Sequence, residues 1–254
     1  MSVDATEEFK PIPVRKGSGP LHSLLYGLRL IVDLQLLTCT RFLRPRLEPV
    51  EGTILDVGCG EMPFRSLMRP QVRYTGLDVP QATSFGMRDH KEIVAFDGTT
   101  IPFPDACFDT LLCTEVLEHA VDPVTLIAEM HRVLRPGGTL LVTVPFAARV
   151  HHAPYDFNRF TRFRLVAMFS AFDELEILER GNDIAVIANK LIVLCVRLAK
   201  PKKIRDLLWT GPLSVLLAPC AIVALLSAHL SLCIGAGSKN DPLGYGVVAR
   251  KSPK

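Results

Sequence analysis

Asp56 and the two glycines that follow it have the residue types and the spacing of a small-molecule binding turn. They end the apolar run Thr53 to Val57, whose β-branched residues predict a short buried strand. Glycine permits a positive φ and lets a ligand approach the backbone without meeting a Cβ. A glycine-rich turn after a strand is a general device for holding nucleotides. The predicted cofactor-binding turn is therefore Gly58, Cys59 and Gly60.

Two features indicate which nucleotide this turn could hold. Asp56 would repel the pyrophosphate that a dinucleotide places near such a turn. Pro63 stands where the dinucleotide fingerprint G-x-G-x-x-G has its third glycine. S-adenosylmethionine (SAM) has no phosphate, and a carboxylate attracts its ammonium and its sulfonium. The turn therefore favours SAM over NAD.

A second carboxylate, Asp78, follows the glycine turn in the sequence. Gln71 to Leu77 predicts the next strand, and Asp78 closes it about 20 residues beyond the turn, where nucleotide-binding α/β folds place the carboxylate that binds the ribose hydroxyls. A surface aspartate that merely ends a strand is the alternative, which the upstream turn weakens.

Glu115 and His119 follow another predicted strand, which begins at Asp109. Their separation would place them on one face of a short helix at the carboxyl edge of the sheet, where open α/β sheets bind ligands. An unperturbed imidazole titrates near neutrality, so His119 is a candidate base facing the substrate. The alternative is that His119 is a structural partner of Glu115.

Five ordered motifs resemble the class I SAM-dependent methyltransferases, in the group that includes the ubiquinone-biosynthesis enzymes. They are I-L-D-V-G-C-G-E-M-P-F (54–64), Y-T-G-L-D-V (74–79), F-D-G-T-T-I-P-F-P-D-A-C-F-D (96–109), T-E-V-L-E-H-A-V-D-P (114–123) and R-V-L-R-P-G-G-T-L-L-V-T-V-P (132–145). The resemblance implies an α/β, Rossmann-like fold with a seven-stranded, mostly parallel sheet whose last strand is antiparallel. It also implies that Asp97 and Gly98 contact the adenine, although Asp97 could instead form an Asx-turn. The expected cofactor contacts are Asp56, Gly58, Cys59, Gly60, Asp78, Asp97, Gly98 and Glu115.

The segment R-V-H-H-A-P-Y-D-F-N-R-F-T-R-F (149–163) carries the substrate-side prediction. In methyltransferases of this kind such a loop closes over the acceptor, and its pattern resembles a subgroup found in glycan and lipid biosynthesis. His152 or Asp156 could remove a proton from an acceptor hydroxyl, and Tyr155 and Arg159 could hold the acceptor. An Arg–Asp pair that pins the loop is the alternative. A metal on His151, His152 and Asp156 lacks a familiar ligand spacing, so no metal is predicted.

Composition places these motifs in one α/β domain with additions. The 254 residues carry a net charge of only +3, which gives no reason to expect a nucleic-acid partner. The seven cysteines include no C-x-x-C pair and favour a reduced, cytoplasmic protein. We expect a flexible arm (1–20), an N-terminal helix over the cofactor cleft (21–50), the SAM-binding core (51–180), an apolar insertion (181–243), and the last strand and tail (244–254). The helix, predicted over 21–43, could instead pack on the sheet or rest on an anionic membrane.

The insertion is the main departure from the family pattern, in which a short hairpin joins the last two strands. It contains two apolar stretches, Ile184–Ala199 and Pro212–Gly235, which flank a basic cluster. The second is long enough to span a bilayer. Because strands six and seven must pair in one sheet, both ends of the insertion lie on one side, which excludes a single span. The sequence therefore predicts a helical hairpin dipping into the cytoplasmic membrane face, with a water-soluble lid or a dimer interface as the alternative.

The expected function is transfer of a methyl group from SAM to an oxygen, or to a carbon or nitrogen, of a lipid-linked, glycan or quinone-like acceptor. Two alternatives remain open. One is a catalytically silent SAM-fold scaffold subunit, against which the intact cofactor motifs argue. The other is a soluble small-molecule methyltransferase whose insertion forms a homodimer.

Overall fold

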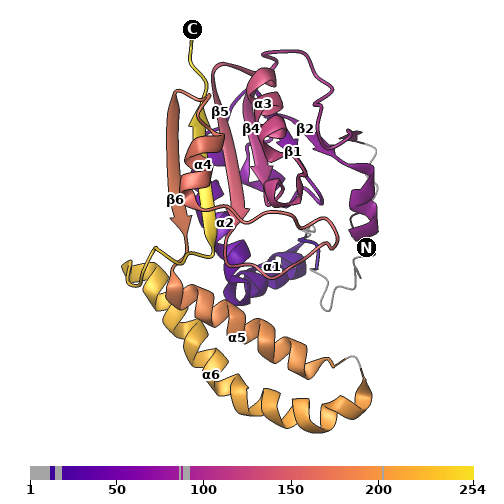
Figure 1. The fold of residues 1–254 in the computed structure, drawn as a ribbon, viewed down its shortest axis with the longest axis vertical. Helices are drawn as coiled ribbons and strands as arrows, with labels where there is room; N and C mark the ends of the chain where they lie inside the picture. Colours follow the sequence, from indigo (N-terminus) through magenta and orange to yellow (C-terminus); the bar gives the residue numbers. More distant parts are fainter. Residues whose placement is uncertain (1–11, 15–18, 86, 88–91, 202) are drawn as a thin grey trace.

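The computed structural model describes residues 12–14, 19–85, 87, 92–201 and 203–254. Its centre is a seven-stranded sheet in the order β3-β2-β1-β4-β5-β7-β6 (Figure 1). β1 to β5 run parallel, whereas β7 is antiparallel to both β5 and β6. This arrangement confirms the predicted α/β, Rossmann-like fold with an antiparallel last strand. The strands are β1 (Thr53–Val57), β2 (Arg73–Asp78), β3 (Ile93–Ala95), β4 (Phe108–Thr114), β5 (Leu134–Pro145), β6 (Glu174–Arg180) and β7 (Gly244–Arg250).

Helices cover both faces of the sheet because its buried strands are apolar on both sides. Successive residues on a strand point to opposite faces, and Leu140 and Leu141 accordingly belong to different core clusters. The first cluster includes side chains of α3 (Pro123–Val133) and α4 (Arg162–Met168), and the second includes those of α2 (Leu34–Leu47). The edge at which β1 and β4 end is therefore left to carry the site.

The N-terminal prediction of one helix over 21–43 is wrong. The chain forms α1 (Pro20–Val32) and α2, which are bent by 108°. Asp33 causes the break, because its carboxylate accepts a hydrogen bond from Leu36 N at 3.1 Å and so caps the second helix. α2 packs on the sheet, whereas α1 buries none of its residues. Most of the predicted arm, 1–20, lies outside the described residues.

Two local predictions differ from the structure in extent. The expected helix at Phe64 to Met68 is only the 3₁₀ turn η1 (Arg65–Leu67), which lies between Pro63 and Pro70, residues without an N–H donor. The predicted helix Thr161 to Phe172 is α4, which ends at Met168. Thr161 caps α4 as predicted, because its hydroxyl accepts from Arg164 N at 3.3 Å.

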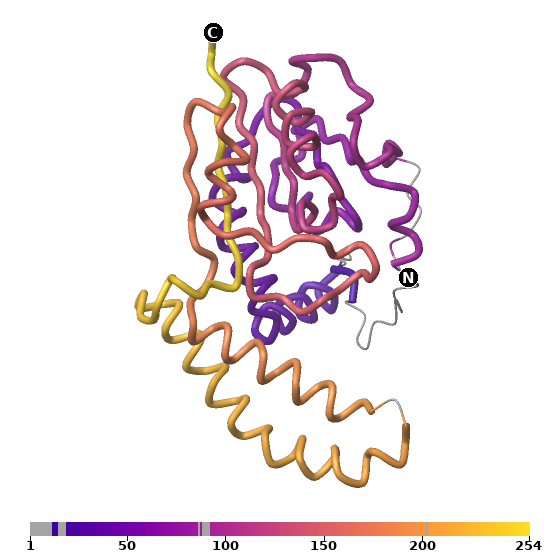
Figure 2. Tube along the Cα trace, in the orientation of Figure 1, coloured from indigo at the N-terminus to yellow at the C-terminus, as the bar shows by residue number. Residues whose placement is uncertain are grey.

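The insertion forms a helical hairpin that extends from the sheet domain (Figures 1 and 2). It consists of α5 (Asp183–Ala199), the 3₁₀ turn η4 (Ile204–Asp206) and α6 (Leu207–Ile234). Arg180 at the end of β6 pairs with Gly244 at the start of β7, so both ends of the hairpin leave one edge of the sheet. α6 is long and apolar enough to cross a membrane, yet only 11% of its most apolar window is buried. The α1–α2 pair passes the same test only if its bend is ignored.

Candidate active site at the carboxyl edge of the sheet

The predicted site residues lie at the ends of β1, β2 and β4, where the strand order reverses. β1 has β2 on one side and β4 on the other, so the connections leave in opposite directions and open a crevice beyond the carboxyl ends. Asp56 is the penultimate residue of β1 and the glycine turn follows that strand. Asp78 ends β2, and Glu115 to His119 follow β4. The fold thus brings together segments that are far apart in the sequence.

Asp56 is a buried carboxylate with one unsatisfied oxygen. Its side chain is 1% exposed, and Oδ2 accepts a hydrogen bond from the Tyr74 hydroxyl at 2.5 Å. Oδ1 has no hydrogen-bond partner among the described residues. Burial raises the pKa of Asp56 to about 7, against the lowering effect of the Tyr74 hydrogen bond. Such a carboxylate is suited to a cationic partner, since an unpaired buried oxygen is costly.

The glycine turn is tied to β2 by backbone hydrogen bonds. Gly58 N and Cys59 N both donate to Leu77 O, at 2.7 and 3.1 Å. Gly60 N donates to Asp78 Oδ2 at 2.7 Å, so the predicted ribose carboxylate also orders the turn. Burial raises the pKa of Asp78. Cys59 packs its side chain near Gly76 and is 3% exposed, and its N–H is already bonded to Leu77 O.

Gly58 is required for a reason that the sequence did not predict. Its φ is +70°, and a Cβ there would lie 2.3 Å from Cγ2 of Val116. The space over Gly58 is therefore filled by Val116, which links the glycine turn directly to the segment after β4.

The predicted adenine contacts and Glu115 are engaged with the protein itself. Asp97 is exposed and accepts from Thr99 N and Thr100 N at 2.8 and 2.7 Å, which is the Asx-turn alternative. These hydrogen bonds lower the pKa of Asp97. Gly98 follows it with a φ of +87°. Glu115 does not pair with His119 on a helix, because it adopts a φ of +54° and its carboxylate binds Arg180 at 2.7 Å.

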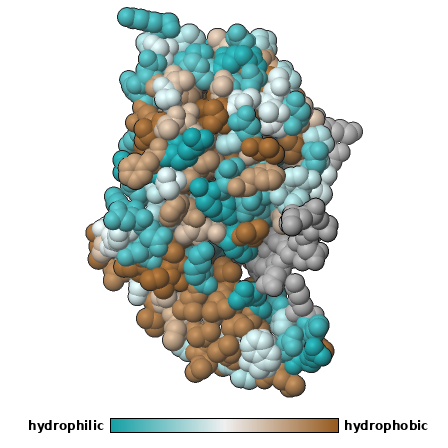
Figure 3. Space-filling view, viewed as in Figure 1, coloured by the Kyte–Doolittle hydropathy of each residue, from teal (hydrophilic) through white to brown (hydrophobic). Residues whose placement is uncertain are grey.

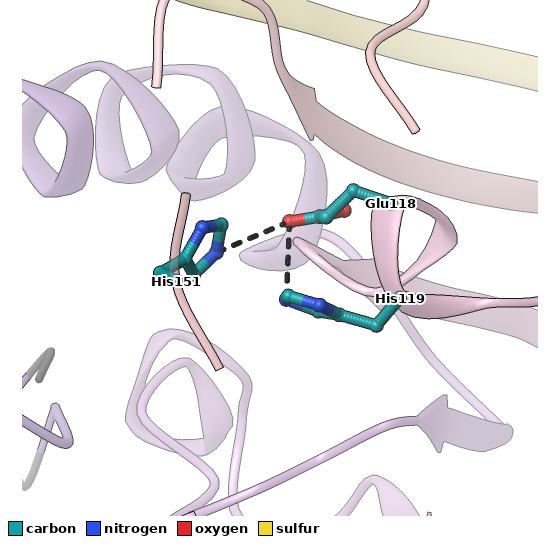
Figure 4. A group of neighbouring side chains, drawn as sticks. All are labelled: Glu118, His119 and His151. Carbon is teal, nitrogen blue, oxygen red and sulfur yellow. Dashed lines mark ion pairs between the residues drawn. The ribbon is translucent and has the colours of Figure 1, made fainter. Parts of the chain in front are cut away.

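Glu118, rather than Glu115, is the carboxylate beside His119 (Figure 4). Both residues lie on the 3₁₀ turn η3 (Leu117–His119), and His119 Nε2 is 3.7 Å from Glu118 Oε1. The same oxygen is 3.9 Å from His151 Nε2, which belongs to the loop after β5. Burial, with a contribution from His151, lowers the pKa of His119. The adjacency of Glu118 and His119 was visible in the sequence, but the third member came from tertiary structure.

The loop after β5 packs against the turn η3. Phe157 N and Asn158 N donate to Glu118 O at 2.9 and 3.0 Å. The His152 ring lies 4.7 Å from the ring of Phe85 and 5.2 Å from that of His119, measured between centroids. Burial lowers the pKa of His152 to about 4, so its imidazole is neutral at pH 7. Tyr155 is 44% exposed, with its ring edge on Phe85.

Asp156 and Arg159 form the loop-pinning pair. The two carboxylate oxygens of Asp156 meet the two terminal nitrogens of Arg159 at 2.6 and 2.8 Å, and Oδ2 also accepts from His151 N at 3.0 Å. The Asp156 side chain is 2% exposed, and these hydrogen bonds lower the pKa of its carboxyl against the effect of burial. This geometry disfavours Asp156 as a base and Arg159 as an anion binder.

The chemistry of the donor set fits SAM. The acidic pair Asp56 and Asp78 lies at the ends of adjacent strands, and the unsatisfied Asp56 oxygen suits an ammonium. These residues would hold the cationic and ribose parts of the cofactor.

Comparisons with known proteins agree with this assignment. Residues 55–142 match the family model described as "Methyltransferase domain". The chain is 35% identical over 96 residues to a "Probable S-adenosylmethionine-dependent methyltransferase" of Mycolicibacterium smegmatis, covering 36% of this chain and 37% of that protein. It is 30% identical over 139 residues to the ubiquinone biosynthesis O-methyltransferase of Pseudomonas paraeruginosa, covering 51% and 55% respectively. The chain thus spans about half or less of the length of these curated relatives.

The fold has a counterpart among solved structures. A SAM-dependent methyltransferase from Archaeoglobus fulgidus matches with a TM-score of 0.52 at 16% identity, covering 90% of this chain and 99% of that one. The match over 55–142 thus identifies a SAM-dependent methyltransferase domain within the chain, and the solved structure agrees with it in fold.

Proposed function

We propose that this protein transfers a methyl group from SAM to an oxygen of an acceptor bound beneath the loop 149–163. The observation that carries the proposal is the buried, partly unsatisfied carboxylate of Asp56 beside Asp78 at the glycine turn. The nearby imidazoles support an oxygen acceptor, because a hydroxyl must lose its proton during transfer. The O-methyltransferase relative supports the same acceptor atom. A silent scaffold would not need a desolvated carboxylate at this position.

One group of residues is proposed to bind the cofactor, and another is proposed to bind the acceptor. Bound SAM supplies an electrophilic methyl group that needs no further activation. Asp56, Asp78 and the backbone of the glycine turn hold it, while Asp97, Gly98 and Glu115 remain proposed neighbours. His119 and His152 are the proposed bases, and Tyr155 lines the acceptor side. As the acceptor oxygen bonds to the methyl carbon, the carbon–sulfur bond breaks, its electron pair stays on sulfur, and the acceptor proton leaves through an imidazole. Asp156 and Arg159 hold the loop.

Replacing Asp78 with alanine tests the cofactor site. Hydrogen bonds to charged groups contribute about 1.5–3 kcal/mol, so Asp78→Ala should weaken SAM binding roughly 10- to 150-fold. Isothermal titration calorimetry on the full chain measures this. Glu51→Gln is the matched control, because Glu51 is an exposed carboxylate that pairs with Arg69 on the surface. No SAM binding by folded wild-type protein would overturn the proposed function.

We further propose that the hairpin docks the protein on an anionic membrane, which would present a lipid-linked, glycan or quinone-like acceptor. Hydrophobic residues gather over the hairpin on the face drawn in Figure 3. Leu208 is 84% exposed, Trp209 60% and Val215 74%. α6 is tied to α1 by a contact between His229 Nε2 and Ile31 O at 2.8 Å, and α1 exposes a further apolar row. Contiguous apolar surface of this extent marks an interaction site.

The basic residues favour a hairpin that lies along the membrane rather than one that dips into it tip first. Arg197, Lys200, Lys203 and Arg205 stand at or near the turn between α5 and α6, which is the far end of the hairpin. Inserting that end would carry these charges into the hydrocarbon core, whereas a helix in the interface plane keeps them among the headgroups. This geometry revises the dipping hairpin expected from the sequence.

Vesicle flotation tests the membrane proposal. Each basic residue near an anionic surface contributes about 1 kcal/mol, so Lys203→Gln/Arg205→Gln should weaken binding to phosphatidylglycerol vesicles roughly 30-fold. Arg73→Gln/Lys254→Gln makes the same charge change at the opposite edge of the sheet and should bind as wild type does. Equal binding by both double variants would contradict the proposal. A concentration-dependent dimer without vesicle binding, seen by analytical ultracentrifugation, would favour the dimer interface.

A further inference from the structure

The side chains of Glu118, His119 and His151 form a cluster, and the methyl-transfer scheme gives a role only to His119. Glu118 is fully buried, and neither oxygen of its carboxylate has a hydrogen-bond partner among the described residues. A buried carboxyl without partners is strongly unfavourable in its ionised form, so it either holds a proton or binds a cation that neutralises it. Two imidazoles lie within ion-pair distance of the Oε1 atom of Glu118, at 3.7 and 3.9 Å, and Arg159 also acts on the carboxyl electrostatically.

Both imidazoles are oriented as metal ligands are. His119 Nδ1 lies 2.8 Å from Tyr155 O, and His151 Nδ1 lies 3.1 Å from Arg149 O and 3.3 Å from Asp156 Oδ2. Because carbonyl and carboxylate oxygens only accept, Nδ1 carries the proton in each ring and Nε2 carries the lone pair. Both lone pairs therefore stand beside the same oxygen, Glu118 Oε1 (Figure 4). Outer-shell partners of this kind fix the tautomer of histidine ligands.

The distances fit a small divalent ion after a slight contraction. The three ligand atoms lie within 4.8 Å of one another. Two ligands about 2.1 Å from a tetrahedral zinc ion stand roughly 3.4 Å apart. Two imidazole nitrogens and one carboxylate oxygen suit zinc and related transition ions, and they leave coordination positions open. Magnesium and calcium prefer oxygen ligands throughout.

We propose that Glu118, His119 and His151 bind a divalent transition-metal ion of the zinc type, whose open position takes the acceptor oxygen. The loop pair supports the site, because Asp156 holds both Arg159 and His151. The site also adjoins the cofactor turn, since Val116, two residues before Glu118, covers Gly58.

This inference rests on the proposed methyl transfer and deepens it. A hydroxyl bound to the metal loses its proton to water more readily. Its oxygen then forms the bond to the methyl carbon while the carbon–sulfur bond breaks and the electron pair remains on sulfur. The proposal restricts the acceptor to a hydroxyl compound that can ligate a metal. In this proposal His119 is a metal ligand and no longer a base. His152 is the neighbouring imidazole that remains outside the ligand set.

Cobalt substitution of the full chain tests the site without an activity assay. Chelator-treated protein should take up Co²⁺ stoichiometrically and show visible d–d absorption without a sulfur-to-cobalt charge-transfer band. Glu118→Gln, His119→Ala and His151→Ala should each lose this spectrum, and Asp156→Asn should weaken Co²⁺ binding about 10- to 100-fold. His22→Ala, which removes an exposed imidazole of α1, should keep it. Circular dichroism establishes that each variant is folded. If Glu118→Gln does not fold, because Glu118 is buried, His119→Ala carries the test instead.

Three results would overturn the inference. They are no stoichiometric cobalt uptake by the wild-type chain, an unchanged spectrum in all three ligand variants, and a thiolate charge-transfer band that assigns the metal to cysteine. Calorimetry with SAM separates this outcome from failure of the proposed function. SAM binding without a metal site would contradict the metal site and leave the methyl-transfer proposal intact. A metal site without SAM binding would contradict the methyl-transfer proposal and leave the metal site intact.

Discussion

Replacing Arg180 with methionine should destabilise the protein by about 3–5 kcal/mol, because removal of one partner leaves a buried ionic network incomplete. The Arg180 side chain is 2% exposed. It donates to Glu115 at 2.7 Å, to Val144 O at 3.0 Å and to Tyr245 O at 3.2 Å, and it also reaches the Cys39 thiol. One guanidinium thus joins β6, β7, β5, α2 and the turn after β4. Urea unfolding followed by circular dichroism measures the loss.

A double-mutant cycle controls this prediction. Glu115→Gln alone should cost less, because the Glu115 side chain is 31% exposed and water can solvate it. Arg180→Met/Glu115→Gln should be more stable than the sum of the single losses indicates, since the second change removes the orphaned charge. Strictly additive losses, or a loss below about 1 kcal/mol for Arg180→Met, would show that the pair does not act as a unit.

The affinity for SAM should rise about tenfold per pH unit as the pH increases from 5 towards 7. Burial raises the pKa of Asp56 to about 7, so below that pH the carboxyl is protonated and must release its proton before it can hold an ammonium. Above about 8 the α-amino group of SAM loses its own charge, and affinity should fall again. Calorimetry across this range measures the profile.

Asp56→Asn should remove the acidic limb of this profile and lower the plateau affinity. The effect of Asp56 on stability has the opposite sign. A carboxyl whose pKa is raised from 3.8 to about 7 on folding binds its proton more tightly in the folded state. Its contribution to stability is complete below pH 3.8 and is lost as the pH rises through about 7. An acidic limb that persists in Asp56→Asn would assign the titration to another group.

Much of the cofactor side could be predicted because its signals are local. Asp56, Gly58 and Gly60 belong to one strand–turn unit, and glycine adopts the positive φ of this turn without the strain that a side chain would add. Asp78 follows from the regular length of a β–turn–β repeat. Both end adjacent parallel strands in the structure, as that repeat implies. The apolar lengths of α5 and α6 likewise predicted the hairpin.

The acceptor side depended on tertiary structure. Glu115 and Glu118 are carboxylates of one short segment, and helical spacing favoured Glu115 as the neighbour of His119. The positive φ of Glu115 and the arrival of Arg180 from β6 turned Glu115 away, while the 3₁₀ turn placed Glu118 beside His119. His151 arrives from the loop after β5. Asp33 similarly divided a continuous apolar stripe by capping α2.

The sequence by itself determined the fold class, the glycine turn after β1 and the existence of the apolar hairpin, because local backbone requirements and hydrophobic periodicity depend on residues that are close together in the chain. Only the tertiary structure decided which carboxylate meets which imidazole and which aspartate pins the loop. Those pairings join residues distant in sequence, and their choice depends on burial and on competition among several possible partners.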